Sequence, residues 1–378
     1  MPSKSLLLLC SLITIQLSYG QIPDTIELRW NGIIDLTTYS KPFWQADTIT
    51  DETTQLIKDD KSVSGTLLFK ARKILSVRST DHSQVFIEGK DWTYKQNRVY
   101  LLTDSSMPFL KKEDLVYTVN KPGWSMKGSK PGTFVLFSES PFFSSMQVAV
   151  TYIPAKSRIW KGPIPVSGKN ELPNTYAKLT NRDNLKVVFF GNSIETGYNS
   201  SGFMNRPPYM PSWPELIIHQ LRAEYGPQIS FSNASVAGKL ATWGKEETAN
   251  RVLPAHPDLV IIGFGMNDGS SNISPAKYRE DINGIITAVT AQNPQAEFIL
   301  IAPMLPNPDA VQNGSQRLYK TELDKLARKG IVVADITGVH AELLKHKSYQ
   351  DMTGNNVNHP NDYLARWYAQ FITGLLLR

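Results

Sequence analysis

The second half of the chain alternates between short, predominantly apolar runs and longer stretches of helical periodicity. The apolar runs occupy residues 185–190, 228–231, 258–263, 297–301 and 331–334. The helical patterns occupy residues 213–225, 244–253, 275–291 and 315–329, and the first of them opens on a capping-box pattern, Ser212-Trp213-Pro214-Glu215. Runs that are apolar at every position are typical of strands buried on both faces. The alternation therefore predicts an α/β fold with a parallel sheet and helices on both of its faces.

The first half of the chain has a different pattern. Short runs rich in β-branched and aromatic residues occupy residues 64–69, 72–77, 84–87, 99–102, 133–137 and 147–152, and glycine-containing turns separate several of them. Regularly spaced strands without helical stretches predict an all-β, jelly-roll-like sandwich. Because 378 residues are many for one domain, we expect a β-sandwich domain over residues 21–165, a linker over 166–184 and an α/β domain over 185–378.

Residues 1–20 have the pattern of a cleavable signal peptide, with Lys4 before an apolar run and small residues up to Gly20. We therefore expect a secreted or periplasmic bacterial protein without stable membrane insertion. Cys10, the only cysteine, lies in this segment, so the mature chain has no disulfide and no cysteine metal site. The formal charge of +6 comes from dispersed lysines and arginines, which argues against a nucleic-acid partner.

Residues able to carry chemistry follow three of the predicted strands. Ser193 comes after Gly191-Asn192 at the end of the first apolar run, Gly238 lies beyond the second, and Asn267 lies beyond the third in Gly265-Met266-Asn267-Asp268. A fourth block, Asn358-His359-Pro360, lies far along the chain. Because open α/β folds bind ligands at the carboxyl ends of their strands, we expect these blocks to meet at one edge of the sheet.

The ordered set of four blocks resembles the SGNH (GDSL-type) hydrolases, which are named for one Ser, Gly, Asn and His. The resemblance covers roughly residues 185–378 and implies a flavodoxin-like hydrolase domain that needs no cofactor and no metal ion. It implies Ser193 as the nucleophile and His359 as the base that takes its proton. It also implies an oxyanion hole made by the backbone N–H groups of Ser193 and Gly238 and the side-chain amide of Asn267.

The sequence departs from the family pattern at two positions. Asn192 stands where the first block usually has an aspartate, and Asn356 stands three residues before His359, where the family usually has the acid that orients the imidazole. Three alternatives remain for that orienting group: Asn356 as a neutral acceptor, Asp351 folded back over the following turn, or a backbone carbonyl that completes a Ser-His dyad.

Aromatic residues near these blocks are the remaining clue to the substrate. We expect Trp213, Trp243 and Tyr198 to offer ring faces on which a sugar can stack. A β-sandwich that precedes an SGNH domain resembles two-domain carbohydrate esterases, which implies a serine esterase that removes O-acetyl groups from carbohydrate through an acyl-enzyme. The alternatives are a lipid or thioester acyl hydrolase and a non-catalytic glycan-binding protein with a degenerate SGNH domain, which Asn192 and Asn356 would favour. The sequence is silent on oligomeric state.

Overall fold

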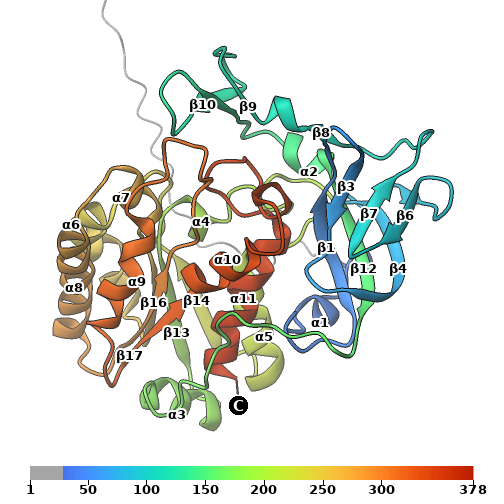
Figure 1. Ribbon diagram of the computed structural model, residues 1–378. Helices are drawn as coiled ribbons and strands as arrows, with labels where there is room; N and C mark the ends of the chain where they lie inside the picture. Colours follow the sequence, from blue (N-terminus) through green and yellow to red (C-terminus); the bar gives the residue numbers. More distant parts are fainter. Residues whose placement is uncertain (1–28, 378) are drawn as a thin grey trace, which may run out of the picture.

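The computed structural model describes residues 29–377, so the expected signal peptide and Cys10 lie outside the described residues. Figure 1 shows an α/β unit formed by the second half of the chain beside a β-rich region formed by the first half. Among the described residues, no helix has the length and apolar character needed to span a membrane.

The α/β unit is built on one five-stranded parallel sheet. In spatial order its strands are β14 (Ile229–Asn233), β13 (Leu185–Gly191), β15 (Leu259–Gly263), β16 (Glu297–Ala302) and β17 (Ile331–Asp335). All neighbouring pairs are parallel, which confirms the predicted α/β class and its five strands. The chain reverses its direction of travel across the sheet between β13 and β15, and such a switch point opens a crevice at the carboxyl ends of the strands.

Nine helices of the described chain belong to or adjoin this unit. They are α3 (Pro173–Asn181), α4 (Ser193–Thr196), α5 (Trp213–Tyr225), α6 (Ala241–Arg251), α7 (Met266–Ser270), α8 (Pro275–Gln292), α9 (Gln316–Asp324), α10 (Ile336–Leu343) and α11 (Asp362–Leu376), with single 3-10 turns at Leu253–Ala255 and Tyr349–Asp351. The helix predicted over 315–329 ends at Asp324, because Arg328 and Ile331 exchange two backbone hydrogen bonds and turn the chain into β17.

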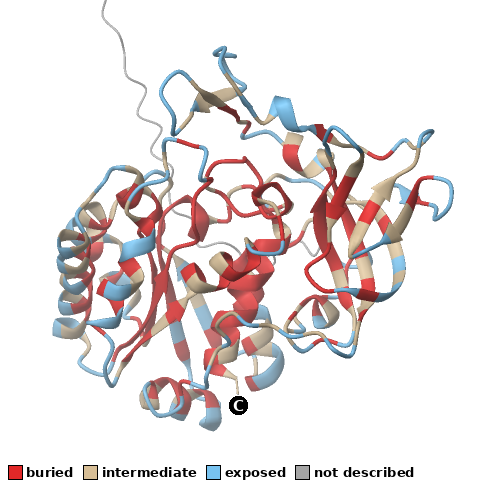
Figure 2. Ribbon diagram, in the orientation of Figure 1, coloured by how far each residue is buried: buried red, intermediate tan, exposed pale blue. Residues whose placement is uncertain are grey.

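Side chains of the central strands alternate between two apolar cores. On β13, Val187 and Phe189 face the core that also holds residues of α5 and α11, whereas Val188 and Phe190 face the core formed with α6, α8 and α9. This alternation buries the central strands on both faces, which explains why their sequence is predominantly apolar. In Figure 2, β16 and α11 are accordingly among the most continuously buried elements, whereas the edge strand β14 is partly exposed.

The β-rich region contains two larger sheets and one small one. The first has the order β1 (Ile49–Gln55), β12 (Gln147–Pro154), β4 (Ala71–Ser79) and β5 (Val85–Phe86); the second has the order β6 (Trp92–Lys95), β7 (Arg98–Leu101), β3 (Val63–Thr66), β2 (Ile57–Lys58) and β8 (Leu110–Lys111). The small sheet joins β10 (Ser125–Lys127), β11 (Phe134–Leu136) and β9 (Val116–Tyr117). All pairs are antiparallel except β2 with β8, which confirms an antiparallel β-rich region. Two short helices, α1 (Leu36–Tyr39) and α2 (Phe142–Met146), and a 3-10 turn at Lys112–Asp114 complete the region.

The strand β1 had no signal in the sequence because its residues are polar. Glu52, Thr54 and Gln55 are nevertheless buried, and the carboxylate of Glu52 accepts hydrogen bonds from the Leu68 N–H and the Tyr152 hydroxyl. A polar strand can be buried when its side chains find such partners.

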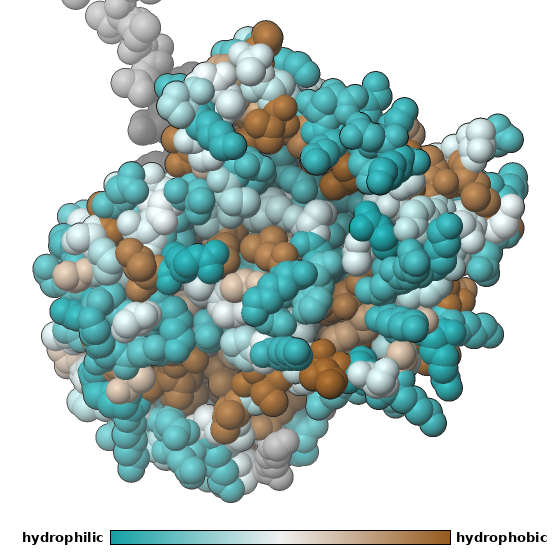
Figure 3. All heavy atoms as spheres, viewed as in Figure 1, coloured by the Kyte–Doolittle hydropathy of each residue, from teal (hydrophilic) through white to brown (hydrophobic). Residues whose placement is uncertain are grey.

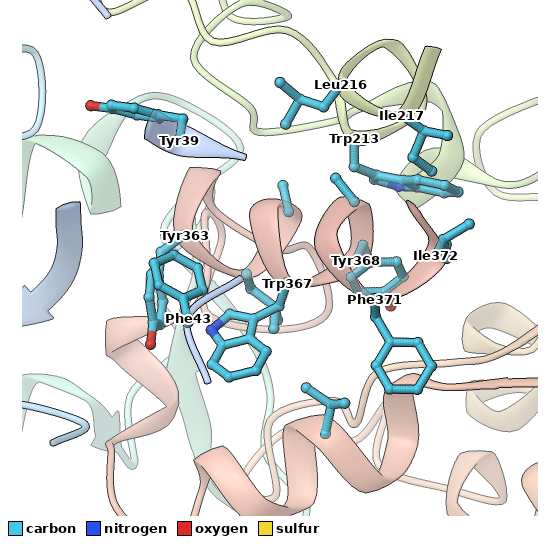
Figure 4. Close-up of a cluster of buried hydrophobic side chains, with 14 of the residues drawn as sticks. Tyr39, Phe43, Trp213, Leu216, Ile217, Tyr363, Trp367, Tyr368, Phe371 and Ile372 are labelled. Atoms are coloured by element: carbon cyan, nitrogen blue, oxygen red, sulfur yellow. The ribbon is translucent and has the colours of Figure 1, made fainter. Parts of the chain in front are cut away.

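The two regions share one apolar core through α11. Figure 4 shows Tyr363 and Trp367 of α11 against Phe43, with ring centroids 4.9 and 5.2 Å apart, and Tyr368 of the same helix beside Trp213 of α5 at 5.5 Å. The expected linker 166–184 is not extended throughout, because it contains α3, whose buried residues join the same core. The β-rich region is therefore packed onto the α/β unit rather than tethered to it.

Candidate active site

Ser193 lies at the carboxyl end of β13, on the first residue of α4. Asn192 caps this short helix, since its Oδ1 accepts the Ile194 N–H at 3.0 Å. Glu195 closes the turn from the other side, with Oε2 accepting the Asn192 N–H at 2.8 Å. Asn192, one of the two departures from the family pattern, is thus a capping residue, and this turn fixes the direction of the Ser193 side chain.

The carboxyl group of Glu195 is fully buried beneath this turn. Burial raises its pKa from 4.5 to about 8, despite the hydrogen bond from Asn192. Glu195 is therefore mostly protonated at neutral pH, and the base of the turn that carries Ser193 has little charge.

His359 meets Ser193 directly: its Nε2 lies 2.9 Å from the Ser193 Oγ. The loop before it is organised by Asn355, whose Oδ1 accepts the N–H groups of three successive residues, Val357, Asn358 and His359, at 2.9 to 3.1 Å. After this loop α11 begins at Asp362, because Asn361 is the residue that caps it. The imidazole is thus held by a hydrogen-bonded loop.

The other ring nitrogen of His359 faces two groups that the sequence did not single out for this role. Nδ1 lies 2.7 Å from Asn199 Oδ1 and 3.3 Å from the Glu139 carboxylate. Asn199 follows α4 in a left-handed conformation, φ 63°, and Gly354 permits its close approach, because a Cβ at Gly354 would lie 2.3 Å from the Asn199 Cβ. Glu139 comes from the β-rich region, between β11 and α2.

Neither side chain expected as the orienting group contacts His359. Asn356 donates from Nδ2 to the Leu136 carbonyl at 2.8 Å, and its Oδ1 accepts from Gln350 at 2.8 Å. Asp351 is buried and accepts the backbone N–H groups of Gln55 and Ser348, at 2.6 and 2.7 Å. Both side chains instead fix the loop before His359 to neighbouring segments. The expectation that Asn356 or Asp351 orients the imidazole of His359 is therefore wrong.

Gly238 and Asn267 lie at the same edge of the sheet as Ser193. The backbone of Ala234 and Val236 donates to Phe189 and Gly191, which carries the Gly238 loop along the end of β13. Gly238 is exposed with φ 79°, a left-handed conformation that favours glycine. Among the described residues, the backbone N–H groups of Ser193 and Gly238 have no hydrogen-bond partner.

Two hydrogen bonds join Asn267 and its neighbour Asp268 to the loop that contains Gly238. Its Nδ2 donates to the Lys239 carbonyl at 3.1 Å, and the neighbouring Asp268 accepts the N–H groups of Ala241 and Gly265 at 2.8 and 3.0 Å. Burial raises the pKa of Asp268 from 3.8 to about 6. Because this value is still below 7, the carboxyl group that accepts these two N–H donors is mostly ionised at neutral pH. The arrangement fixes the two blocks relative to each other.

The three aromatic candidates have different surroundings. The Tyr198 ring lies 5.5 Å from the His359 ring and 4.5 Å from that of Phe203, so it borders the reactive pair. Trp243 packs on Phe190 and lies beside Arg251. Trp213 is almost fully buried and donates to the Ile194 carbonyl at 2.9 Å, so it belongs to the core and offers no face to a ligand, which corrects that expectation.

The geometry can activate a hydroxyl group. A serine hydroxyl is within hydrogen-bond distance of an imidazole, the opposite ring nitrogen has two acceptors, and free backbone donors lie at the same edge. A hydroxyl group in contact with an imidazole is the arrangement of a nucleophile and its base. The described residues contain no group of three or more His, Cys, Asp or Glu side chains placed to hold a metal ion.

Residues 189–366 match the model of the GDSL-like Lipase/Acylhydrolase family. An arylesterase of Vibrio mimicus is 27% identical over 104 residues, which are 28% of this chain and 48% of that protein, so the chain spans about half the length of this curated relative. Among solved structures, a two-domain esterase described as active on acetylated mannans is 21% identical and covers 57% of this chain and 54% of that one, with a TM-score of 0.45. A catalytic mutant of an acetylxylan esterase from Geobacillus stearothermophilus is 17% identical and covers 49% of this chain and 90% of that one, with a TM-score of 0.40.

Proposed function

We propose that this chain, whose residues 189–366 match the GDSL-like Lipase/Acylhydrolase family model, is a serine esterase that removes O-acetyl groups from carbohydrate. The observation that carries the proposal is the 2.9 Å contact between Ser193 Oγ and His359 Nε2. A buried serine hydroxyl in contact with an imidazole has a base for its proton during attack on a carbonyl.

The proposed reaction has two halves. In the first, Ser193 Oγ attacks the acetyl carbonyl while His359 takes the hydroxyl proton, and the oxyanion accepts hydrogen bonds from the N–H groups of Ser193 and Gly238 and from the Asn267 amide. Collapse breaks the ester bond, His359 returns the proton to the departing sugar oxygen, and acetyl-Ser193 remains. In the second, His359 takes a proton from water as the water attacks the acyl-enzyme, and acetate leaves with Ser193 restored.

Asn199 keeps the imidazole in the form that this reaction needs. Its Oδ1 accepts the Nδ1 proton of His359 at 2.7 Å, which leaves Nε2 unprotonated and able to accept the serine proton. A wrong tautomer at this point cost a serine protease about four orders of magnitude. Asn199 therefore serves as a positioning residue.

The surroundings of the pair suit a polyhydroxylated substrate. Tyr198 and the half-exposed Phe203 form an aromatic surface beside His359, and aromatic faces bind sugar rings well. Asn199 also lines a cavity of about 240 Å³, together with serine hydroxyls and the side chains of Asp81, His82 and Arg206, but the lining of this cavity includes neither Ser193 nor His359.

We also propose that the protein is secreted. The pattern of residues 1–20 supports export, and a carbohydrate polymer is a substrate that an exported enzyme meets outside the cytoplasm.

The test compares wild type, Ser193→Ala and a control variant, Ser232→Ala, whose serine is exposed on β14. Released acetate is measured with a panel of acetylated glycans and with a short-chain acetyl ester. We expect release from wild type and Ser232→Ala and a loss of at least about 10⁴-fold in Ser193→Ala. Faster turnover of long-chain acyl esters would indicate a lipid hydrolase instead, and glycan binding without release from any ester would indicate a binding protein.

A further inference from the structure

Glu139 is the only carboxylate that the described residues place against His359, and it comes from the β-rich region. Its Oε2 lies 3.3 Å from His359 Nδ1, and its Oε1 accepts from Asn355 Nδ2 at 3.0 Å. Its carbonyl oxygen accepts from Asn199 Nδ2 at 3.5 Å. Glu139 thus contacts the imidazole, the loop that carries the imidazole and the amide that fixes its tautomer.

The segment that carries Glu139 is fixed to the α/β unit on its N-terminal side. Val135 of β11 packs in a small buried cluster with Ala310 and Val357, both from loops of the α/β unit. One residue further on, the Leu136 carbonyl accepts the hydrogen bond from Asn356. In Figure 1, β10 and β9 of the same small sheet lie above the α/β unit, and the sheet also packs on the β-rich region, because Leu136 of β11 shares a buried cluster with Leu110 of β8. The position of Glu139 is therefore set by contacts with the loop that bears His359.

These contacts explain why position 356 holds an amide. Asn356 donates to the Leu136 carbonyl, and an aspartate at that position, being ionised, would have no proton to donate there. An acid that the family usually carries three residues before its histidine is absent from this chain, and a carboxylate from another part of the chain lies near the same ring nitrogen. The amide at 356 docks the strand that brings that carboxylate.

We infer that Glu139 is the acidic positioning residue of His359, supplied by the β-rich region to complete the site of the α/β unit. The inference rests on the proposed function. Asn199 holds the tautomer, and Glu139 provides the negative charge that stabilises the imidazolium formed when Ser193 gives up its proton. The two tasks that one aspartate performs in a Ser-His-Asp triad are divided between an amide and a carboxylate.

The charge state of Glu139 agrees with this role. Partial burial alone raises its pKa, but its hydrogen bond and charge interaction with His359, together with its bond from Asn355, outweigh burial, and the pKa is lowered from 4.5. The carboxylate is therefore ionised at neutral pH. Its side chain is 46% exposed, so water screens the interaction and the effect is smaller than that of a buried triad acid.

The first variant is Glu139→Gln in the full chain, which keeps the shape and removes the charge. We expect kcat on a short acetyl ester to fall about 10- to 100-fold while KM changes less than about twofold, because the lost charge acts on the transition state. We also expect the acid limb of the kcat/KM profile to move to lower pH, since the imidazolium loses its negative neighbour. Glu113→Gln, an exposed carboxylate of the same region, is the matched control and should leave both quantities unchanged.

The second variant returns the charge from another direction. In Glu139→Gln/Asn199→Asp the carboxylate at 199 contacts Nδ1 itself, and aspartate tolerates the left-handed backbone of that position. We expect kcat to recover to within about fivefold of wild type, because the carboxylate at position 199 replaces the negative charge that Glu139→Gln removes. A merely structural role for Glu139 gives no such recovery.

Three results would overturn the inference: an unchanged kcat in Glu139→Gln, an acid limb that does not move, or a double variant no more active than the single one. The rate at which a fluorophosphonate labels Ser193 separates this failure from that of the proposed function, because labelling needs the same proton transfer but no acetyl ester. If wild type labels rapidly and releases no acetate, the substrate assignment fails, and slower labelling of Glu139→Gln still supports the role of Glu139. Equal labelling of the two proteins overturns it.

Discussion

The two ring nitrogens of His359 face different regions of the molecule. Nε2 faces Ser193, which the end of β13 presents within the α/β unit, whereas Nδ1 faces Asn199 and, across the junction, Glu139 of the β-rich region. The first contact depends on a local turn at the edge of a sheet. Of the Nδ1 contacts, the one with Asn199 lies within the same unit, whereas the one with Glu139 depends on the docking of the two regions.

The largest expected effect comes from breaking the junction itself. Lys347 and Glu52 form a fully buried ion pair at 2.5 Å between the segment after α10 and β1. Lys347→Ala leaves the Glu52 carboxylate buried without its cation, and we expect the free energy of unfolding in urea to fall by about 3–5 kcal/mol. Lys345→Ala, which removes a mostly exposed partner of Glu342, should cost less than about 1 kcal/mol. Equal losses in the two variants would mean that the buried pair does not join the regions.

The double variant Glu52→Gln/Lys347→Met tests the same junction without leaving a buried charge. It should recover most of the stability lost in Lys347→Ala, because a neutral pair carries no uncompensated charge. Recovery of stability with normal esterase activity would show that the pair holds the regions together but takes no part in the chemistry.

The α/β side of the comparison is tested at Asn267, the proposed side-chain donor to the oxyanion. Asn267→Ala should lower kcat by about 10²–10³-fold, which corresponds to about 2.7–4 kcal/mol, with little change in KM. Unlike Glu139→Gln, it should leave the acid limb of the pH profile in place, because no charge near His359 is altered. Asn283→Ala on the exposed face of α8 is the control. A shift of the acid limb in Asn267→Ala would contradict the separate roles of the two groups.

The third test concerns the stability of the nucleophile turn. Because burial raises the pKa of Glu195 to about 8, the folded chain holds a proton that the unfolded chain releases above about pH 4.5. The free energy of unfolding should therefore fall as the pH rises, by about 3–4 kcal/mol from about pH 5 to pH 8. Glu195→Gln should flatten this dependence, measured by urea unfolding at several pH values. Glu224→Gln, exposed on α5, should retain the slope of wild type, and an unchanged slope in Glu195→Gln would refute the assignment.

The smallest effect concerns substrate contact by the two regions. Figure 3 shows apolar surface scattered over both regions, and two half-exposed rings belong to aromatic pairs: Phe203 with Tyr198 in the α/β unit, and Trp124 with Phe142 in the β-rich region. Replacing either ring by alanine should raise KM for an acetylated polysaccharide by about 2- to 10-fold, or about 0.5–1.5 kcal/mol, without affecting a small acetyl ester. A change with Phe203→Ala alone would restrict sugar contact to the α/β unit.

The sequence predicted the α/β unit well because its signals are local. Strands buried on both faces have to be apolar throughout, and the turn after β13 had to place Ser193 at the edge of the sheet, so both could be inferred from a few adjacent residues. The strand β1 could not be inferred, because its buried polar residues find partners far away in the chain.

The same limit applied to the group that orients His359. Family spacing directed attention to Asn356 and Asp351, which are close in sequence, whereas the atoms near Nδ1 belong to residues 160 and 220 positions away. The left-handed asparagine at 199 and the amide in place of an acid at 356 were the available signals. Neither identifies Glu139, because the docking of β11 onto the His359 loop is decided by tertiary packing.

The spacing of these residues along the chain has a consequence for biosynthesis. A ribosome makes Glu139 and Ser193 long before the imidazole, which follows the nucleophile by 166 residues. Domains generally fold as units while they are being made. The nascent chain therefore carries its serine turn without a base for it, and the proposed esterase activity can begin only after the loop around His359 and the helix α11 that joins the two regions have been made.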